Sequence, residues 1–376
     1  MGMRFFFFGI FHRKSVYNIL NEKSRDIMKK ILFTGGGSAG HVIPNLALIE
    51  ELLSEGAIEV CYMGTNGIEK RLVSEWNIPF YEIECPKLIR GKSWAVWKRN
   101  LHIPAEFHRA KKQALNILSN LRPDVIFSKG GYVALPVVWA AKKLHIPCYS
   151  HESDFSAGLA NRLLARKCKY VFTSFPETAK RLPHGKYSGA PLRRSLFNAT
   201  RAEARKYFSI PFHSKVLLIF GGGSGSASIN EAVRKHLKSL TEQYFVLHVC
   251  GKGNMVECNM KNYLQFEFIA DMGKAYACAD LVIARAGAGT LFELLALQKP
   301  ALLIPLERQT RGDQVENAAY FAAKGLCHVL KQDYLFTLPQ AVEEAFADEK
   351  MKERLQENTF QRGNERILSE LKRALQ

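Results

Sequence analysis

The 376-residue sequence lacks several patterns that mark common functional classes. Its eight cysteines are scattered without C-x-x-C or Cys/His zinc spacing, in a chain too long to need disulfide staples. This predicts reduced thiols in a cytosolic protein. The apolar run Phe5–Phe11 is far shorter than the about 20 residues that span a bilayer, and no small-residue cleavage site of a signal peptide follows it. A weak membrane anchor is the alternative reading of that run.

Acidic residues are scarce relative to basic ones, since 35 Asp and Glu stand against 53 Lys and Arg. The net charge of +18 and the pI near 9.5 imply attraction to nucleic acid, to an anionic membrane face or to phosphorylated substrates. No zinc spacing, basic heptad region or RNP-like aromatic motif accompanies this charge. We therefore expect no nucleic-acid partner, and steep salt-sensitive binding to duplex DNA would revive that class.

The chain is organised around the stretch Gly35–His41, which follows the apolar run Ile31–Thr34 and precedes a helix-like segment. Glycines let the backbone come close to a ligand, and the amides of a new helix favour an anion, so we expect a phosphate-bearing ligand here. The glycines also satisfy G-x-G-x-x-G, the pattern of dinucleotide-binding oxidoreductases. That fold needs an acidic residue after the second strand, where Gly64-Thr65 stands instead, so this rival is weakened.

Apolar strand-like runs alternate with longer helix-like segments, which predicts parallel α/β sheets. The length exceeds what one core usually supports, and the pattern restarts after a short Gly-Ala-Pro segment within 187–194, so we expect two Rossmann-like domains facing a central cleft. The expected strands are Ile31–Thr34, Val60–Met63, Val125–Ser128, Cys148–His151, Tyr170–Thr173, Val216–Phe220, Phe245–Cys250, Phe266–Ile269, Leu281–Ala284 and Ala301–Pro305.

We expect the chain to be divided into four segments. Residues 1–27 are an upstream extension or a mis-assigned start, because Met28 begins the first strand naturally. Residues 28–190 form the first domain and residues 191–348 the second. Residues 349–376 form a charged helical segment without a following strand, which we expect to pack back on the first domain.

Ligands of such sheets bind beyond the carboxyl ends of the strands. Polar and glycine-rich loops follow several predicted strands, including a second glycine loop at Gly221–Gly225, and together they indicate a large, phosphate-containing ligand. Glu293, a few residues into a helix, is either a ribose-binding carboxylate or a solvated surface residue.

These segments together resemble the MurG family of bacterial peptidoglycan glycosyltransferases, two-domain GT-B enzymes of glycosyltransferase family 28. The resemblance covers nearly the whole chain from Met28. It implies an inverting hexosyltransferase that moves N-acetylglucosamine from UDP-N-acetylglucosamine to the C4 hydroxyl of the muramoyl sugar of lipid I, making lipid II for the cell wall. The matching pieces are Gly36–Pro44, Gly130–Val133, His151–Asp154, Ala157–Asn161, Pro191–Arg193, the second glycine loop, Phe268–Met272, Arg285–Glu293, and Asp313-Gln314 with Asn317.

Carried over by position, the family's donor contacts imply roles for residues of both halves. Arg193 would bind the pyrophosphate or its sugar, although an ion pair at the domain boundary is its structural alternative. The backbone of Ile269 would pair with uracil, Glu293 with ribose and Gln314 with the hexose. The implied ligand-binding residues are Ser38, Ala39, Gly40, Arg193, Gly223, Ser224, Ile269, Ala288, Gly289, Thr290, Leu291, Phe292, Glu293 and Gln314.

The reaction needs a base for the acceptor hydroxyl and groups that stabilise the departing UDP. His41, at a helix N-terminus that favours its neutral form, is the first choice, and Asp154 and Glu152 are the alternatives. Asp154 stands where many relatives carry Asn. No D-x-D is present to hold a metal-bound nucleotide sugar, so we expect no metal or other cofactor, and glycine-loop amides, helix dipoles and Arg193 would carry the leaving-group charge.

The segment Pro86–Arg99 alternates basic residues with two tryptophans. Trp favours the headgroup level and each basic residue adds about 1 kcal/mol near an anionic leaflet, so the segment would dock the protein peripherally on the cytoplasmic face of the membrane. A solvated basic loop is the alternative. Lys129 is a further group that would neutralise the pyrophosphate of the acceptor.

Three other functions stay open at this point. Another GT-B enzyme would move a hexose to a different lipid such as diacylglycerol, and only an acceptor assay separates the two. A sugar-nucleotide epimerase would act on the UDP-sugar without a lipid acceptor. A nucleic-acid-binding module ranks last.

Overall fold

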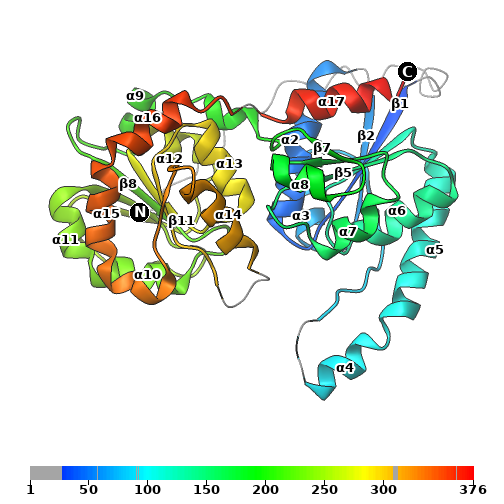
Figure 1. Ribbon diagram of the computed structural model, residues 1–376, viewed down its shortest axis with the longest axis horizontal. Coiled ribbons are helices and arrows are strands. Elements are labelled where there is room, and N and C mark those ends of the chain that lie inside the picture. The colour runs from blue at the N-terminus through cyan, green and yellow to red at the C-terminus, as the bar shows by residue number, and fades with distance from the viewer. Residues whose placement is uncertain (1–27, 57, 90, 92, 308–311, 361) are drawn as a thin grey trace, which may run out of the picture.

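The computed structural model describes residues 28–376 except 57, 90, 92, 308–311 and 361, so the expected extension 1–27 lies outside the described residues. Two α/β domains lie side by side along the long axis of the molecule (Figure 1). Each contains one sheet whose neighbouring strands are all parallel. The predicted fold class is confirmed.

The first domain is built on a seven-stranded sheet of order β3-β2-β1-β4-β5-β6-β7. Its central strands are fully buried, as expected for a parallel sheet with helices on both faces; β4 is largely apolar, whereas β5 ends in the buried polar residues Ser150, His151 and Glu152. The strands are β1 (Lys29–Thr34), β2 (Ile58–Gly64), β3 (Phe80–Glu82), β4 (Val125–Ser128), β5 (Cys148–Glu152), β6 (Tyr170–Thr173) and β7 (Gly185–Tyr187). The helices are α2 (Ala39–Glu55), α3 (Ile68–Ser74), α4 (Trp94–Asn100), α5 (Ile103–Leu121), α6 (Ala134–Lys143), α7 (Leu159–Ala165) and α8 (Pro176–Arg181).

The second domain repeats the design with a six-stranded sheet of order β10-β9-β8-β11-β12-β13. Its strands are β8 (Val216–Phe220), β9 (Phe245–Val249), β10 (Tyr263–Phe266), β11 (Leu281–Ala284), β12 (Ala301–Leu303) and β13 (His328–Val329). Its helices are η1 (Arg194–Phe197), α9 (Arg201–Tyr207), α10 (Ala227–Lys235), α11 (Leu237–Gln243), α12 (Met272–Cys278), α13 (Ala288–Ala296), α14 (Asp313–Ala322), η2 (Gln332–Thr337), α15 (Leu338–Ala347) and α16 (Glu349–Glu357).

The strand predicted at Phe266–Ile269 is wrong, because the sheet holds Tyr263–Phe266 instead. Beyond Phe266 the chain turns away: the Glu267 carboxylate accepts a hydrogen bond from the N–H of Gly253, and Phe268 is 71% exposed. The apolar residues of this segment therefore enter a loop at the carboxyl end of the sheet. The short edge strands β3, β7 and β13 were not predicted.

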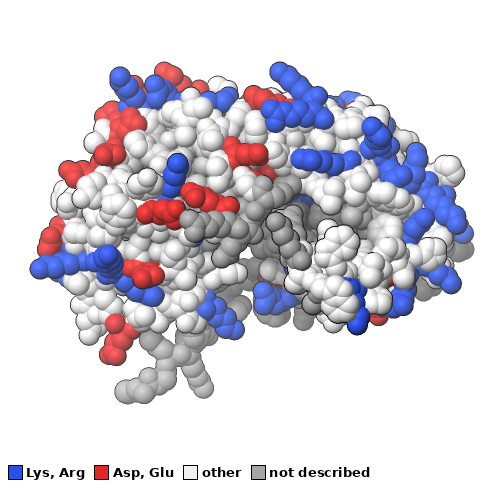
Figure 2. Space-filling view, turned by 60° about the horizontal axis from the view of Figure 1, so that its bottom comes forward, with Lys and Arg blue, Asp and Glu red and all other residues white. Residues whose placement is uncertain are grey.

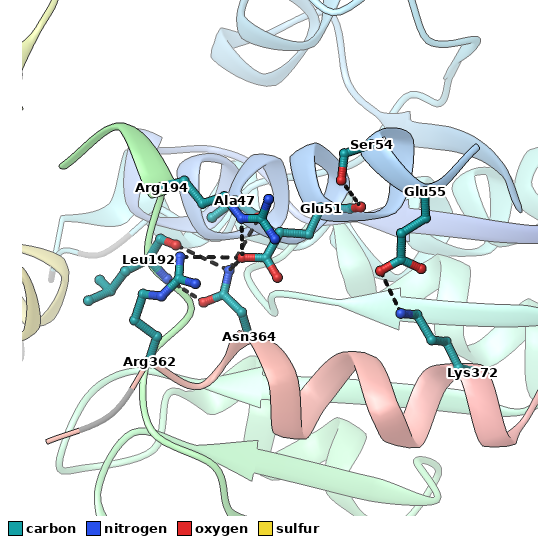
Figure 3. Close-up of polar contacts among 9 residues, drawn as sticks. All are labelled: Ala47, Glu51, Ser54, Glu55, Leu192, Arg194, Arg362, Asn364 and Lys372. Carbon is teal, nitrogen blue, oxygen red and sulfur yellow. Dashed lines mark hydrogen bonds and ion pairs between the residues drawn. The ribbon is translucent and has the colours of Figure 1, made fainter. Parts of the chain in front are cut away.

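From Met28 onward the described chain crosses between the domains twice, once after β7 and once after α16. It ends in α17 (Asn364–Arg373), which packs on α2 of the first domain (Figures 1 and 3). Asn364 joins the two crossings, since its carboxamide accepts from the N–H of Leu192 (2.9 Å) and donates to the carbonyl of Leu192 (3.1 Å). It also donates to Glu51 of α2 (2.9 Å). Arg194 and Arg362, one from each crossing, pair with the same Glu51 carboxylate at 3.6 and 3.4 Å.

Replacing Asn364 by Ala should lower the free energy of unfolding by about 2 kcal/mol, because the buried backbone groups of Leu192 would lose their partners. Urea unfolding followed by circular dichroism measures this change. Ser369→Ala, at an exposed position of the same helix, is the matched control and should leave the midpoint unchanged. Equal midpoints for the two variants would show that the crossings do not depend on Asn364.

Candidate functional site

The first glycine loop joins β1 to α2 and carries His41 in the first turn of the helix. Gly35 and Gly37 adopt φ of 141° and 82°, and a side chain on Gly37 would collide with Tyr132, so this turn requires glycine. Ser38 Oγ lies 3.1 Å from His41 Nδ1 and orients the ring. Ser38 and Gly40 are exposed and Ala39 is half-buried, so the predicted loop residues lie at the surface of the site.

A buried carboxylate that the sequence did not single out, that of Glu69, stabilises this loop by hydrogen bonds. Glu69, in the first turn of α3, accepts hydrogen bonds from the N–H of Gly37 (3.1 Å), from the N–H of Thr65 (3.0 Å) and from the Thr65 hydroxyl. Gly36 leaves room for it, since a Cβ there would lie 2.4 Å from the Glu69 carboxyl carbon. The amide of Gly37 is thus used within the protein.

Lys129 directly follows β4, and His151 lies on the neighbouring strand β5; both are buried. Burial lowers the pKa of the Lys129 ammonium, against the nearby charges of Glu152 and Asp154, which raise it. Burial and then the Lys129 charge lower the pKa of His151 well below its usual range, so this histidine is neutral. Its Nε2 lies 3.1 Å from the carbonyl oxygen of Gly189 at the first domain crossing.

The Glu152 carboxylate accepts hydrogen bonds from both ends of the loop that follows β5. Its Oε1 accepts from the N–H of Asp154 (3.0 Å), and its Oε2 accepts from the N–H of Gly158 (2.8 Å) and the amide of Asn161 (3.0 Å). With 5% of its surface exposed and three N–H donors, this carboxylate shapes the loop 153–158.

The same loop touches the second domain through Asn317 of α14. The Asn317 amide donates to Asp154 Oδ1 (3.0 Å), and its carbonyl oxygen accepts from the N–H of Phe155 (2.9 Å). Because Asp154 follows β5 and α14 follows β12, the carboxyl-terminal ends of the two sheets meet at this point. The region around it is called the interdomain site below.

The second glycine loop lies between β8 and α10, with Gly223 and Ser224 exposed. A buried guanidinium supports it: Arg285, directly after β11, donates to Ser226, Ser228 and Gln332, each at 2.8 Å. The position of Arg285 at a strand end, before a glycine-rich helix start, was the only sequence signal for this role.

Arg193 and Glu293, which the sequence assigned to different parts of one ligand, lie 3.6 Å apart. The Glu293 side chain is 16% exposed and accepts a hydrogen bond from the Tyr276 hydroxyl (2.9 Å), so it is no solvated surface residue. Burial raises the pKa of Glu293, against the opposing effects of Arg193 and Tyr276. Arg193 Nε is buried and has no hydrogen-bond partner among the described residues.

The other predicted ligand residues lie on the same edge of the second sheet. Ile269 is buried in the loop after β10, and Gln314 in the first turn of α14 accepts from the N–H of Leu306 (3.0 Å). Helix α13 begins at Ala288 after the N-cap Gly287, with no acidic residue in its first turn. Ala288, Leu291 and Phe292 are buried, and Gly289 and Thr290 are accessible.

Known proteins resemble the chain over both domains. The family models described as glycosyltransferase family 28 N-terminal and C-terminal domains match residues 31–173 and 216–371. A UDP-N-acetylglucosamine–N-acetylmuramyl-(pentapeptide) pyrophosphoryl-undecaprenol N-acetylglucosamine transferase of Clostridium perfringens is 45% identical over 313 residues, 81% of this chain and 86% of the relative. The chain belongs to the MurG family of glycosyltransferases. The same-named protein of Lachnoclostridium phytofermentans is 43% identical, over 86% and 92% of the two chains.

Solved structures agree with the MurG assignment, which the motifs had predicted and which is confirmed. MurG of Acinetobacter baumannii matches with a TM-score of 0.71 and 26% identity, over 92% of this chain and 99% of that one. The calicheamicin glycosyltransferase CalG4 matches with a TM-score of 0.70 at 16% identity, which shows a shared fold.

In the described part of this MurG-family chain, no three or more His, Cys, Asp or Glu side chains are grouped so that they could hold a metal ion. None of the helices in this part has the length and apolar character needed to cross a bilayer.

Proposed function

We propose that this protein transfers N-acetylglucosamine from UDP-N-acetylglucosamine to the C4 hydroxyl of the muramoyl sugar of undecaprenyl-pyrophosphoryl-MurNAc-pentapeptide (lipid I), forming lipid II with inversion. The observation that carries the proposal is the Clostridium perfringens relative, 45% identical over 86% of its length, whose name states this donor and acceptor. The reaction belongs to peptidoglycan synthesis and thereby serves cell shape and division.

The second domain supplies the donor site in this proposal. Three groups at the carboxyl-terminal edge of the second sheet would serve it: the amides at the start of α13, the exposed second glycine loop with Gly223 and Ser224, and the Arg193 guanidinium, which pairs with Glu293 of α13. They would bind the diphosphate and stabilise UDP as it leaves, without a metal ion. Glu293 would then accept from the ribose hydroxyls.

Two further groups would complete donor recognition. The backbone of Ile269 lies in the loop after β10, where it would read the uracil edge. Because the Gln314 carbonyl oxygen already accepts from Leu306, its amide N–H groups are the part that would donate to the hexose hydroxyls.

His41 is the proposed general base. The Ser38 contact fixes the ring through Nδ1, so Nε2 is the atom that would take the proton of the C4 hydroxyl. As that oxygen bonds to the anomeric carbon from the opposite side, the bond from this carbon to the β-phosphate oxygen breaks, and its electron pair leaves with UDP. Asp154 is the second choice as base. Glu152 has a supporting role, because three N–H groups already hold its oxygens.

The experiment that tests the function mixes the protein, in EDTA, with radiolabelled UDP-N-acetylglucosamine and either a lipid I analogue or diacylglycerol. Label in the lipid I analogue alone is the expected result, and it would also support metal independence. Label in diacylglycerol alone would instead indicate a different lipid glycosyltransferase with the same fold. Label in neither lipid would contradict the proposal and return the epimerase to consideration.

Replacing His41 by Ala should lower kcat at least about 100-fold, because general-base catalysis typically contributes that much or more. UDP affinity, measured by calorimetry, should stay within about twofold of the wild type, since His41 lies in the other domain. Glu293→Ala is the contrasting variant and should weaken UDP binding. Undiminished turnover by His41→Ala would leave Asp154 as the base.

The first domain carries the proposed membrane contact. Helix α4 and the segment leading to it project from this domain as an arm, residues 86–101 except 90 and 92 (Figure 1). Trp94 and Trp97 are 77% and 68% exposed, and Lys98 lies over the Trp94 ring at 5.3 Å. Arg90 and Lys92, which were part of the predicted docking segment, lie outside the described residues.

The charge of the first domain also supports a membrane contact through this domain. Residues 28–190 hold 23 Lys and Arg against 13 Asp and Glu, and Figure 2 shows Lys and Arg gathered over the first domain. Exposed tryptophan beside basic groups suits the headgroup region of an anionic leaflet. We infer peripheral attachment to the cytoplasmic face of the membrane, with the first domain toward the lipid acceptor.

The double substitution Trp94→Ser/Trp97→Ser should weaken binding to vesicles containing phosphatidylglycerol by at least about tenfold, because two large aromatic surfaces are lost from the contact. Vesicle flotation measures the bound fraction. Phe212→Ser is the matched control, since this phenylalanine is 84% exposed in the second domain. Unchanged vesicle binding by the tryptophan variant would leave the arm as a solvated loop.

A further inference from the structure

The contact between Asn317 and the loop after β5 uses both ends of one carboxamide. Asn317 is fully buried, and it presents its N–H to Asp154 and its oxygen to the N–H of Phe155, two adjacent residues of the other domain. A residue that only donates or only accepts cannot make both bonds. These two hydrogen bonds of Asn317 therefore form a specific polar contact between the domains, in addition to the apolar packing.

The loop 153–158 is fixed from both sides. Its own domain holds the backbone, since Glu152 accepts from the N–H of Asp154 and of Gly158. The second domain holds the Asp154 side chain through Asn317. Phe155 then packs between domains, with ring centroids 5.5 Å from Phe175 and 5.2 Å from Tyr320 of α14.

Charge explains why a neutral partner stands at position 317. Asp154 already has the buried ammonium of Lys129 near it in its own domain. A carboxylate at 317 would face the Asp154 carboxylate at about the same 3.0 Å separation, which is strongly unfavourable in a buried place. An amide instead donates to Asp154 without adding charge.

We propose that Asn317 is a positioning residue for the transfer reaction: it sets Asp154 and the loop 153–158 of the acceptor domain relative to helix α14 of the donor domain. Gln314, the proposed hexose-binding residue, lies three residues earlier on that helix. Helix α14 would thus bind the donor sugar through Gln314 and contact the loop 153–158 through Asn317, about one turn later. The inference rests on the proposed function for its effect on catalysis, and on geometry alone for its effect on the loop.

The first test is independent of catalysis and compares four proteins: wild type, Asn317→Asp, Asp154→Asn, and the double variant with the two residues exchanged. The exchange keeps both bonds, since the carboxylate then at position 317 accepts from the N–H of Phe155 and from the amide then at position 154. Hydrogen exchange of the peptide containing Phe155 should be at least about tenfold faster in Asn317→Asp, as loss of about 1.4 kcal/mol of local stability implies. The double variant should return close to the wild-type rate, because both bonds are kept. A double variant as fast as Asn317→Asp would overturn the proposal.

The second test measures kinetics in Asn317→Ala, with Glu316→Ala, at an exposed position of the same helix, as control. We expect kcat on the lipid I analogue to fall at least about tenfold, because misplacing a group near the reacting atoms costs this much or more. KM for UDP-N-acetylglucosamine should stay close to that of the control. The unfolding midpoint should fall, because buried hydrogen bonds are lost, so kcat is compared at a temperature where circular dichroism shows both variants folded. Unchanged kcat would overturn the positioning role. A wild-type protein that transfers nothing would instead count against the proposed function, while the exchange experiment still decides the contact.

Discussion

All strands of a parallel sheet end at the same edge, and this constraint decides where the chain places its polar side chains. His41, Lys129 and Asp154 follow different strands of the first sheet, yet the topology brings them to one edge. The second sheet does the same with its glycine loop and the start of α13. The interdomain site exists because these two edges meet, which requires the domains to keep a fixed relation.

Two buried asparagine carboxamides contribute to that relation. Asn364 ties the two crossings of the chain to α2, and Asn317 ties α14 to the loop after β5. A buried amide that uses its donor and acceptor together tolerates little displacement, whereas apolar packing alone tolerates sliding. Helix α2 carries His41 at its start and Glu51, a partner of Asn364, near its end.

The sequence predicted the sheets because buried parallel strands are short apolar runs, such as Val125–Ser128 and Leu281–Ala284, whose bounds are confirmed. It failed at Phe266–Ile269, where apolar residues enter a loop. The glycine turns and the motif residues could also be predicted, because each is defined by residues that are adjacent in the sequence.

The contacts of the supporting residues were not predictable, because their partners are distant in sequence. Glu69 acts on a glycine 32 residues away, and Asn317 on an aspartate 163 residues away. Asn317 belonged to a motif of the resemblance, together with Asp313-Gln314. No local pattern showed which groups Glu69 or Asn317 contacts. Glu293 shows the same limit: sequence left its burial open, and only the packing of Tyr276 and Arg193 around it decided the matter.

The last helix has a consequence for the order in which the protein is made. Ile367, Leu368 and Leu371 of α17 are part of the hydrophobic core that covers one face of the first sheet. Synthesis proceeds from the N-terminus, so the first domain emerges from the ribosome long before this part of its core exists. Its final packing must wait until the second domain has been translated, and the domain made first is the one completed last.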